Sequence, residues 1–104
     1  MNLPVNNRDE LILLLNQNKE AILAFGVKRM GVFGSFSRND VNQNSDVDFV
    51  VEFVEGQKSY DNFIGLAYFL EDLLGRKIEL VTPQSLSPYI GPRIMKEVEY
   101  VVAA

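Results

Sequence analysis

The chain has 104 residues, of which 47% are hydrophobic and 23% charged, and its net charge is −4. This is an ordinary globular composition, and the length predicts one domain over residues 1–104, with no room for a separate substrate-binding domain. Histidine and cysteine are both absent, which excludes imidazole bases, thiolate nucleophiles, disulfides and the usual zinc sites. Any bound metal would therefore be a hard cation held by oxygen ligands, such as Mg²⁺.

Charge and hydropathy also bear on partners and location. The adjacent basic pairs, Lys28–Arg29 and Arg76–Lys77, do not make a basic face, so binding to nucleic acid is not indicated. The acidic balance disfavours an anionic membrane surface, and no apolar run approaches the roughly 20 residues that a membrane span needs. The sequence predicts a soluble, cytoplasmic protein.

Residues 8–24 are predicted to form an amphipathic helix. Asn7 can cap it, with Glu10 three positions later as in a capping box. Asn18 is one polar interruption, and Gly26 supplies the stop. The apolar stripe predicts a face packed on a sheet, and it consists of Leu11, Leu14, Leu15 and Ile22.

A buried strand is predicted from Val27 to Phe33, and Gly31 within it indicates close backbone approach or packing against a helix. The chain then turns at Gly34–Ser35 into a short helix over residues 36–38. Asn39 tolerates the left-handed backbone that suits the end of this helix.

The next strand is predicted over residues 46–53. Its side chains alternate, so Asp46, Asp48 and Val50 face one side, while the opposite side carries Val47, Phe49 and Val51. The two carboxylates therefore share a face, directed towards the Gly34–Ser35 turn.

A second long helix is predicted over residues 60–74, capped by Ser59 and ended by Gly75. A short strand over residues 77–81 follows, and Glu79 interrupts its apolar pattern. We expect this strand to lie beside the Asp46–Asp48 strand.

The last predicted helix opens at Ser87–Pro88, and Gly91–Pro92 favours an irregular first turn. The apolar tail 100–102 either pairs with the sheet edge or meets a partner protein. The predicted fold class is α/β (α+β), a small mixed β-sheet flanked by helices.

The central stretch contains the residue types that nucleotidyl transfer needs. A Gly–Ser turn lets the backbone approach a phosphate, and the Ser35 hydroxyl adds a donor. Asp46 and Asp48 would repel a triphosphate unless Mg²⁺ bridged them, with two ions as the expected number. Glu79 is the candidate third carboxylate, able to complete the ligand set and to accept the proton of an attacking hydroxyl.

Each feature also has an ordinary structural explanation. An Asp-x-Asp pair often faces solvent, and a Gly–Ser turn is usually only a turn. Glu79 taken alone fits a solvated edge-strand residue, and Arg38 fits a surface ion pair. The ordered combination is what favours a site.

That combination resembles the nucleotidyltransferase superfamily that includes DNA polymerase β. It is most similar to the minimal members that act as antitoxins of HEPN toxins. The similarity extends over most of the chain from Val32 onward, and its signature segments are 32–38, 45–52 and 78–86.

The resemblance implies a role for each matching residue. Gly34 and Ser35 would bind the nucleotide phosphates, with Arg38 as a further phosphate contact, and the catalytic residues and Mg²⁺ ligands would be Asp46, Asp48 and Glu79. Two positions depart from the family pattern. Asn39 stands where glycine is common, and Glu79 stands where aspartate is usual.

The leading hypothesis is Mg²⁺-dependent transfer of AMP from ATP to a hydroxyl, a tyrosine of a cognate HEPN toxin as the resemblance implies. In this role the enzyme is an antitoxin. Glu79 and Asn39 motivate the alternative, a weak or inactive enzyme that neutralises its partner by binding alone. A third hypothesis, nucleotidyl transfer to an antibiotic, usually requires an additional helical domain.

Overall fold

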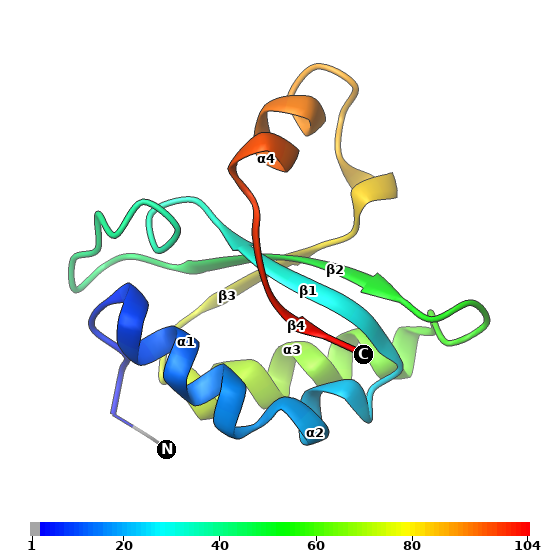
Figure 1. The fold of residues 1–104 in the computed structure, drawn as a ribbon, viewed down its shortest axis with the longest axis horizontal. Helices are drawn as coiled ribbons and strands as arrows, with labels where there is room; N and C mark the ends of the chain where they lie inside the picture. Colours follow the sequence, from blue (N-terminus) through cyan, green and yellow to red (C-terminus); the bar gives the residue numbers. More distant parts are fainter. Residues whose placement is uncertain (1–2) are drawn as a thin grey trace.

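A computed structural model describes residues 3–104 and places a four-stranded mixed sheet against a layer of helices (Figure 1). The strand order is β3-β2-β1-β4. β1 is antiparallel to both β2 and β4, whereas β2 and β3 run parallel. The strands are β1 (Val27–Phe33), β2 (Val47–Phe53), β3 (Ile78–Val81) and β4 (Glu99–Ala103). The predicted α/β fold class with a small mixed sheet is confirmed.

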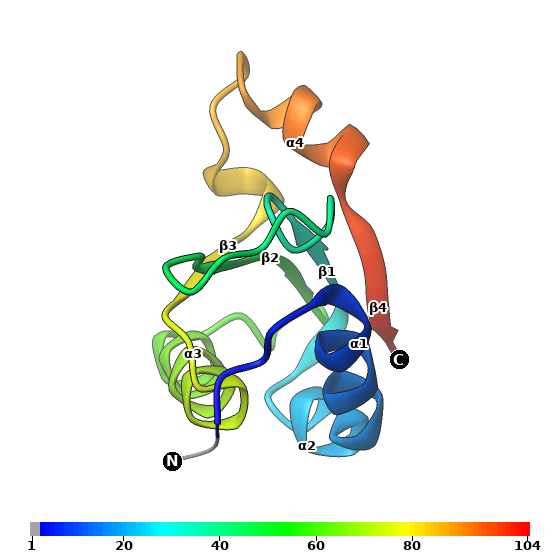
Figure 2. The same ribbon diagram turned by 90° about the vertical axis from the view of Figure 1, so that its left-hand side faces the viewer.

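Three helices cover one face of the sheet, as Figure 2 shows, and they are α1 (Arg8–Gln17), α2 (Lys19–Leu23) and α3 (Tyr60–Leu74). The 3₁₀ turn η1 (Pro83–Ser85) and helix α4 (Gly91–Glu97) lie on the other side. The core fills the space between α1–α3 and the sheet, and its central side chains include Leu11, Leu15, Met30, Phe49, Leu66 and Leu70. None of the helices within residues 3–104 is long and apolar enough to cross a membrane.

The predicted single helix over residues 8–24 is wrong in one respect, because the chain breaks it at Asn18 into α1 and α2. Asn18 has a backbone φ of −114° and ψ of 18°, outside the helical region. Its side-chain amide donates to the carbonyl of Leu14 over 2.9 Å. An asparagine that bonds to the preceding turn competes with helix propagation, so the polar interruption becomes a helix boundary.

The predicted starts of the two long helices are confirmed. Asn7 accepts the backbone N–H of Glu10 at 2.9 Å, and Ser59 accepts that of Asn62 at 3.1 Å. The carboxylate of Glu10 reaches the backbone N–H of Asn6 at 2.8 Å, one residue earlier than a standard capping box requires. These caps fix where α1 and α3 begin.

The predicted short helix over residues 36–38 is wrong, because this segment forms a series of turns. The N–H of Arg38 donates to Gly34, that of Asn39 to Phe36 and that of Asp40 to Ser35, so no single helical repeat continues. Asn39 has a φ of +55°, which confirms the expected left-handed backbone. The turn therefore presents individual backbone groups rather than a helix N-terminus.

The carboxy-terminal segment settles two further expectations. Residues 88–90 form a turn and α4 begins only at Gly91, three residues after the predicted opening at Pro88. The apolar tail becomes β4, the edge strand beside β1. A Cβ on Gly31 would lie 2.4 Å from Cγ1 of Val98 and 2.9 Å from the carbonyl oxygen of Glu99, which confirms close backbone approach and explains why β4 can dock there.

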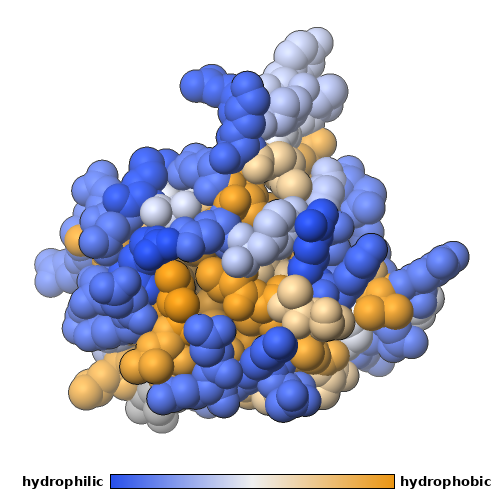
Figure 3. Space-filling view, viewed as in Figure 1, coloured by the Kyte–Doolittle hydropathy of each residue, from blue (hydrophilic) through white to orange (hydrophobic). Residues whose placement is uncertain are grey.

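The surface is unevenly apolar (Figure 3). Hydrophobic residues gather over the lower half of that view, where Figure 1 places the helices, while the projecting part that contains α4 is largely hydrophilic. In α4 only Gly91 is buried. The α4 segment is thus an arm that stands away from the core.

Candidate active site

The sheet register brings two of the predicted acids together. β2 and β3 pair so that Asp48 lies directly opposite Glu79, as the expected strand adjacency required. Asp46 is exposed and precedes β2, which begins at Val47 rather than at the predicted residue 46. Within residues 3–104 no three acidic side chains already form a metal-binding group. The structure therefore provides a close pair with Asp46 beside it.

The Gly34 turn lies against the same acids. Phe33, the last residue of β1, is opposite Asp48 in the sheet. A Cβ placed on Gly34 would lie 2.2 Å from Oδ2 of Asp48, and Gly34 has a φ of +73°. Glycine is needed here for both the backbone angle and the space. The predicted phosphate-binding turn and the predicted metal ligands thus share one end of the sheet.

Asp48 is electrostatically crowded. Burial first, and then the negative charge and hydrogen bond of Glu79, raise the pKa of Asp48 to about 6. The charges of Asp46 and Glu97 add to this effect. This accumulation of negative charge around Asp48 favours the binding of either a proton or a cation.

We expect Asp48→Asn to stabilise the metal-free protein near neutral pH and not in acid. The folded-state pKa of Asp48 is raised, so the unfolded chain loses this proton first and stability falls as pH rises from about 4 to about 6. Asparagine lacks this penalty. Because Asp48 is only half-buried, screening by water reduces the gain to about 1 kcal/mol.

Urea unfolding in a chelator at about pH 3.5 and about pH 7.5 measures this difference. The wild type and the Asp48→Asn variant should coincide in acid and separate near neutrality. A gain of the same size at both pH values would contradict the electrostatic explanation.

The other predicted nucleotide ligands, Ser35 and Arg38, belong to the same turn. Within residues 3–104 the hydroxyl of Ser35 has no hydrogen-bond partner, so it is free to donate. The backbone N–H of Gly34 donates to Oε1 of Glu97 at 3.0 Å, and the guanidinium of Arg38 forms an ion pair with the same carboxylate. Arg38 is more than half exposed, so it lies at the rim of the turn.

Arg76 is a structural residue of the site that the sequence reasoning missed. Its Nε donates to the carbonyl of Val5 at 2.6 Å, and one terminal nitrogen donates to the carbonyls of Asn42 at 2.9 Å and Ser45 at 2.8 Å. The guanidinium also lies over the buried ring of Phe36, with its central carbon 5.2 Å from the ring centroid. One side chain thus connects the loop before Asp46 to the turn after Gly34.

Glu97 was also missed, and the sequence held little sign of either residue. Arg76 follows the helix-ending Gly75 and precedes the acid-bearing strand, a position that favours contact with the neighbouring loop. Glu97 is 63 residues from its backbone donor, Gly34. No local pattern predicts a contact over that separation.

The residues present fit a hard divalent cation. The candidate ligands Asp46, Asp48 and Glu79 offer carboxylate oxygens, and the crowding that raises the pKa of Asp48 is relieved when a cation binds beside it. Asp46, Asp48 and Glu79 are the residues that would hold Mg²⁺.

The chain is similar to known nucleotidyltransferases. Residues 12–101 match the family model described as a nucleotidyltransferase domain. Protein adenylyltransferase MntA of Thermococcus cleftensis is 42% identical over 89 residues, which cover 86% of this chain and 89% of that protein.

Two solved structures share the fold. One is a toxin–antitoxin with AMP-PNP, with a TM-score of 0.64 and 22% identity, covering 94% of this chain and 74% of the other. The second is the tri-AMPylated Shewanella oneidensis HEPN toxin in complex with MNT antitoxin, with a TM-score of 0.56, 20% identity, and coverage of 94% and 71%. At these identities the likeness supports the fold alone.

Proposed function

Because the chain belongs to the nucleotidyltransferase domain family, we propose that it transfers AMP from ATP to a hydroxyl group of a partner protein. The observation that carries this proposal is the position of the Gly34 turn against Asp48, which is itself paired with Glu79. A phosphate-binding turn and a carboxylate cluster this close together can act on the same bound nucleotide. The relative at 42% identity is named a protein adenylyltransferase.

In the proposed step the acceptor hydroxyl oxygen attacks the α-phosphorus of ATP. A bond forms between these atoms, the bond from the α-phosphorus to the bridging oxygen of the β-phosphate breaks, and pyrophosphate leaves with the electron pair. Glu79 is exposed beside Asp48 and accepts the proton of the hydroxyl. Ser35 and the Gly34 backbone orient the phosphates.

Mg²⁺ held by Asp46, Asp48 and Glu79 would neutralise the negative charge that develops on the phosphates and on the leaving pyrophosphate. Glu79 is one methylene longer than the aspartate usual in the family. The pairing of position 79 with Asp48 across β2 and β3 supports a role for this longer carboxylate beside the other acid.

For the acceptor we propose a tyrosine of a cognate HEPN toxin, with this chain acting as the antitoxin. The support is the solved complex of an AMPylated HEPN toxin with MNT antitoxin, which shares this fold. The cytoplasmic location stays a prediction of the sequence.

Transfer of label to the partner tests the function. The chain, Mg²⁺ and the HEPN-type protein encoded beside it are incubated with ATP labelled either at the α- or at the γ-phosphate. We expect label on the partner from α-labelled ATP only, because pyrophosphate carries the γ-phosphate away. The label should resist denaturation and map to a tyrosine.

The absence of any transferred label would contradict the enzymatic function. If the chain then still formed a stable complex with the partner and still suppressed its toxicity, neutralisation by binding alone would replace the proposal.

A further inference from the structure

The carboxylate of Glu97 occupies the phosphate-binding turn. It accepts the backbone N–H of Gly34 at 3.0 Å and pairs with the guanidinium of Arg38, while the Glu97 carbonyl accepts the Ser37 hydroxyl at 3.1 Å. A backbone N–H and an arginine are the donors that a phosphate oxygen takes in proteins. Glu97 therefore uses the groups expected to receive a nucleotide.

Its surroundings favour release of this carboxylate. Glu97 is the last residue of α4, where a negative charge opposes the helix dipole. It also lies close enough to Asp48 for the two charges to repel each other. Among residues 3–104, the contacts to Gly34 and Arg38 are those that hold this carboxylate, and the Arg38 side chain is 57% exposed.

We propose that Glu97 holds the nucleotide-binding turn of the free protein in a closed state, and that a nucleotide phosphate must displace its carboxylate to bind Gly34 and Arg38. This inference rests on the proposed function, because it concerns the regulation of that same site. Free protein then binds nucleotide more weakly than its turn and acids alone would allow.

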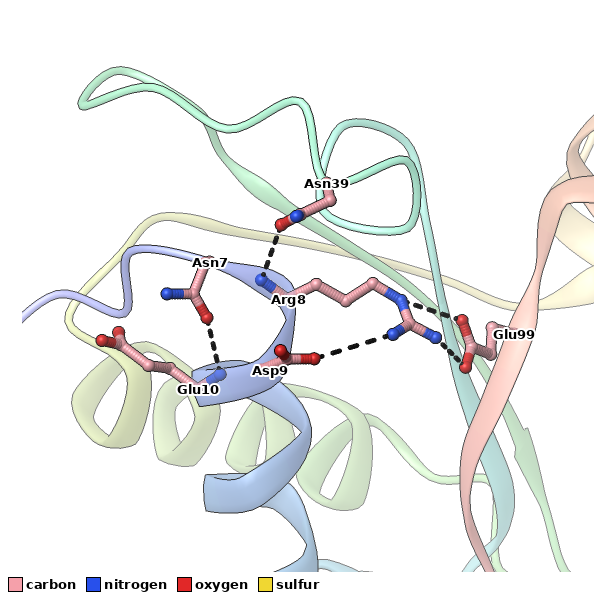
Figure 4. Close-up of polar contacts among 6 residues, drawn as sticks. All are labelled: Asn7, Arg8, Asp9, Glu10, Asn39 and Glu99. Atoms are coloured by element: carbon pink, nitrogen blue, oxygen red, sulfur yellow. Dashed lines mark hydrogen bonds and ion pairs between the residues drawn. The ribbon is translucent and has the colours of Figure 1, made fainter.

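The fold permits this displacement without unfolding the sheet. Figure 4 shows Arg8 reaching from the start of α1 to Glu99, with its Nε donating to Oε2 of Glu99 at 3.1 Å. Glu99 also pairs with Val32 in the sheet. The start of β4 is thus fixed, whereas the α4 arm before it stands away from the core (Figure 2), and Gly91 is its one buried residue. Glu97 can leave by a turn of its side chain or a shift of the arm about Val98.

Calorimetric binding of a non-hydrolysable ATP analogue tests the proposal, with and without Mg²⁺. Glu97→Gln keeps the side-chain shape but removes its charge, and Glu97→Asp keeps the charge but shortens the reach. We expect both variants to bind the analogue about tenfold more tightly than the wild type, the gain from losing one charged competitor. Glu55→Gln, in the turn beyond the far end of β2, is the control for net charge.

The outcomes separate the inference from the function. If the wild type binds the analogue and neither Glu97 variant binds it more tightly, the proposal fails while the function stands. Equal tightening by Glu55→Gln would also overturn it, because net charge would then explain the gain. If no variant binds the analogue, the proposed function fails, and the inference fails with it. Circular dichroism of each variant verifies that it is folded.

Discussion

Asp48→Asn and Asp46→Asn are each expected to lower the rate of AMP transfer about a thousandfold. Asparagine preserves the shape of each side chain but removes the negative charge that would hold Mg²⁺ against the nucleotide phosphates. Asp48 should be the more sensitive position, because it contacts both the Gly34 turn and Glu79. The labelling assay with α-labelled ATP measures the rate.

A matched control separates this effect from a general change in charge. Asp61→Asn alters an exposed acid in the first turn of α3, and it should transfer AMP at the wild-type rate. Wild-type rates in both Asp46→Asn and Asp48→Asn would remove these acids from the mechanism. Urea unfolding of Asp48→Asn verifies that this variant is folded before its rate is compared.

Arg76→Met is expected to destabilise the protein by about 2–3 kcal/mol and to slow AMP transfer about a hundredfold. The variant leaves the carbonyls of Val5, Asn42 and Ser45 without their shared donor. Because Arg76 is only partly buried, water replaces part of the lost bonding, which limits the loss of stability. The loop before Asp46 then loses its fixed position.

Arg76→Lys distinguishes positioning from charge, because a single ammonium cannot reproduce the planar fork or its stacking on Phe36. We expect it to restore little of the rate. The rate and the KM for ATP are measured at a temperature where all variants are folded, and the main loss should be in kcat. Arg93→Met, an exposed arginine of α4, is the control for stability. Wild-type stability and kcat in Arg76→Met would contradict this role.

Sequence patterns predicted the strands and the long helices well, because these depend on local periodicity and on capping. Asn7, Ser59 and Gly75 mark element ends in the structure as expected. The errors concern the interior of the first predicted helix and the short segments. A single asparagine at position 18 divides the first helix, and the segment 36–38 closes into turns, because in both places one side chain or backbone angle outweighs helix propensity.

By itself the sequence determined the kind of chemistry available. The absence of histidine and cysteine leaves oxygen ligands, carboxylates, hydroxyls, lysine and arginine for any catalysis. The Gly34–Ser35 turn and the spacing of Asp46 and Asp48 favour chemistry on a phosphate. It also predicted the strand that contains Glu79, and the alternation along that strand placed this acid opposite the apolar face.

Only the tertiary structure decided how these residues are held. The register of β2 on β3 sets Glu79 against Asp48, Arg76 joins the loop and the turn, and Glu97 occupies the donors of Gly34 and Arg38. These contacts join segments that are tens of residues apart. Their free energy comes from packing and charge across the fold, which no local pattern records.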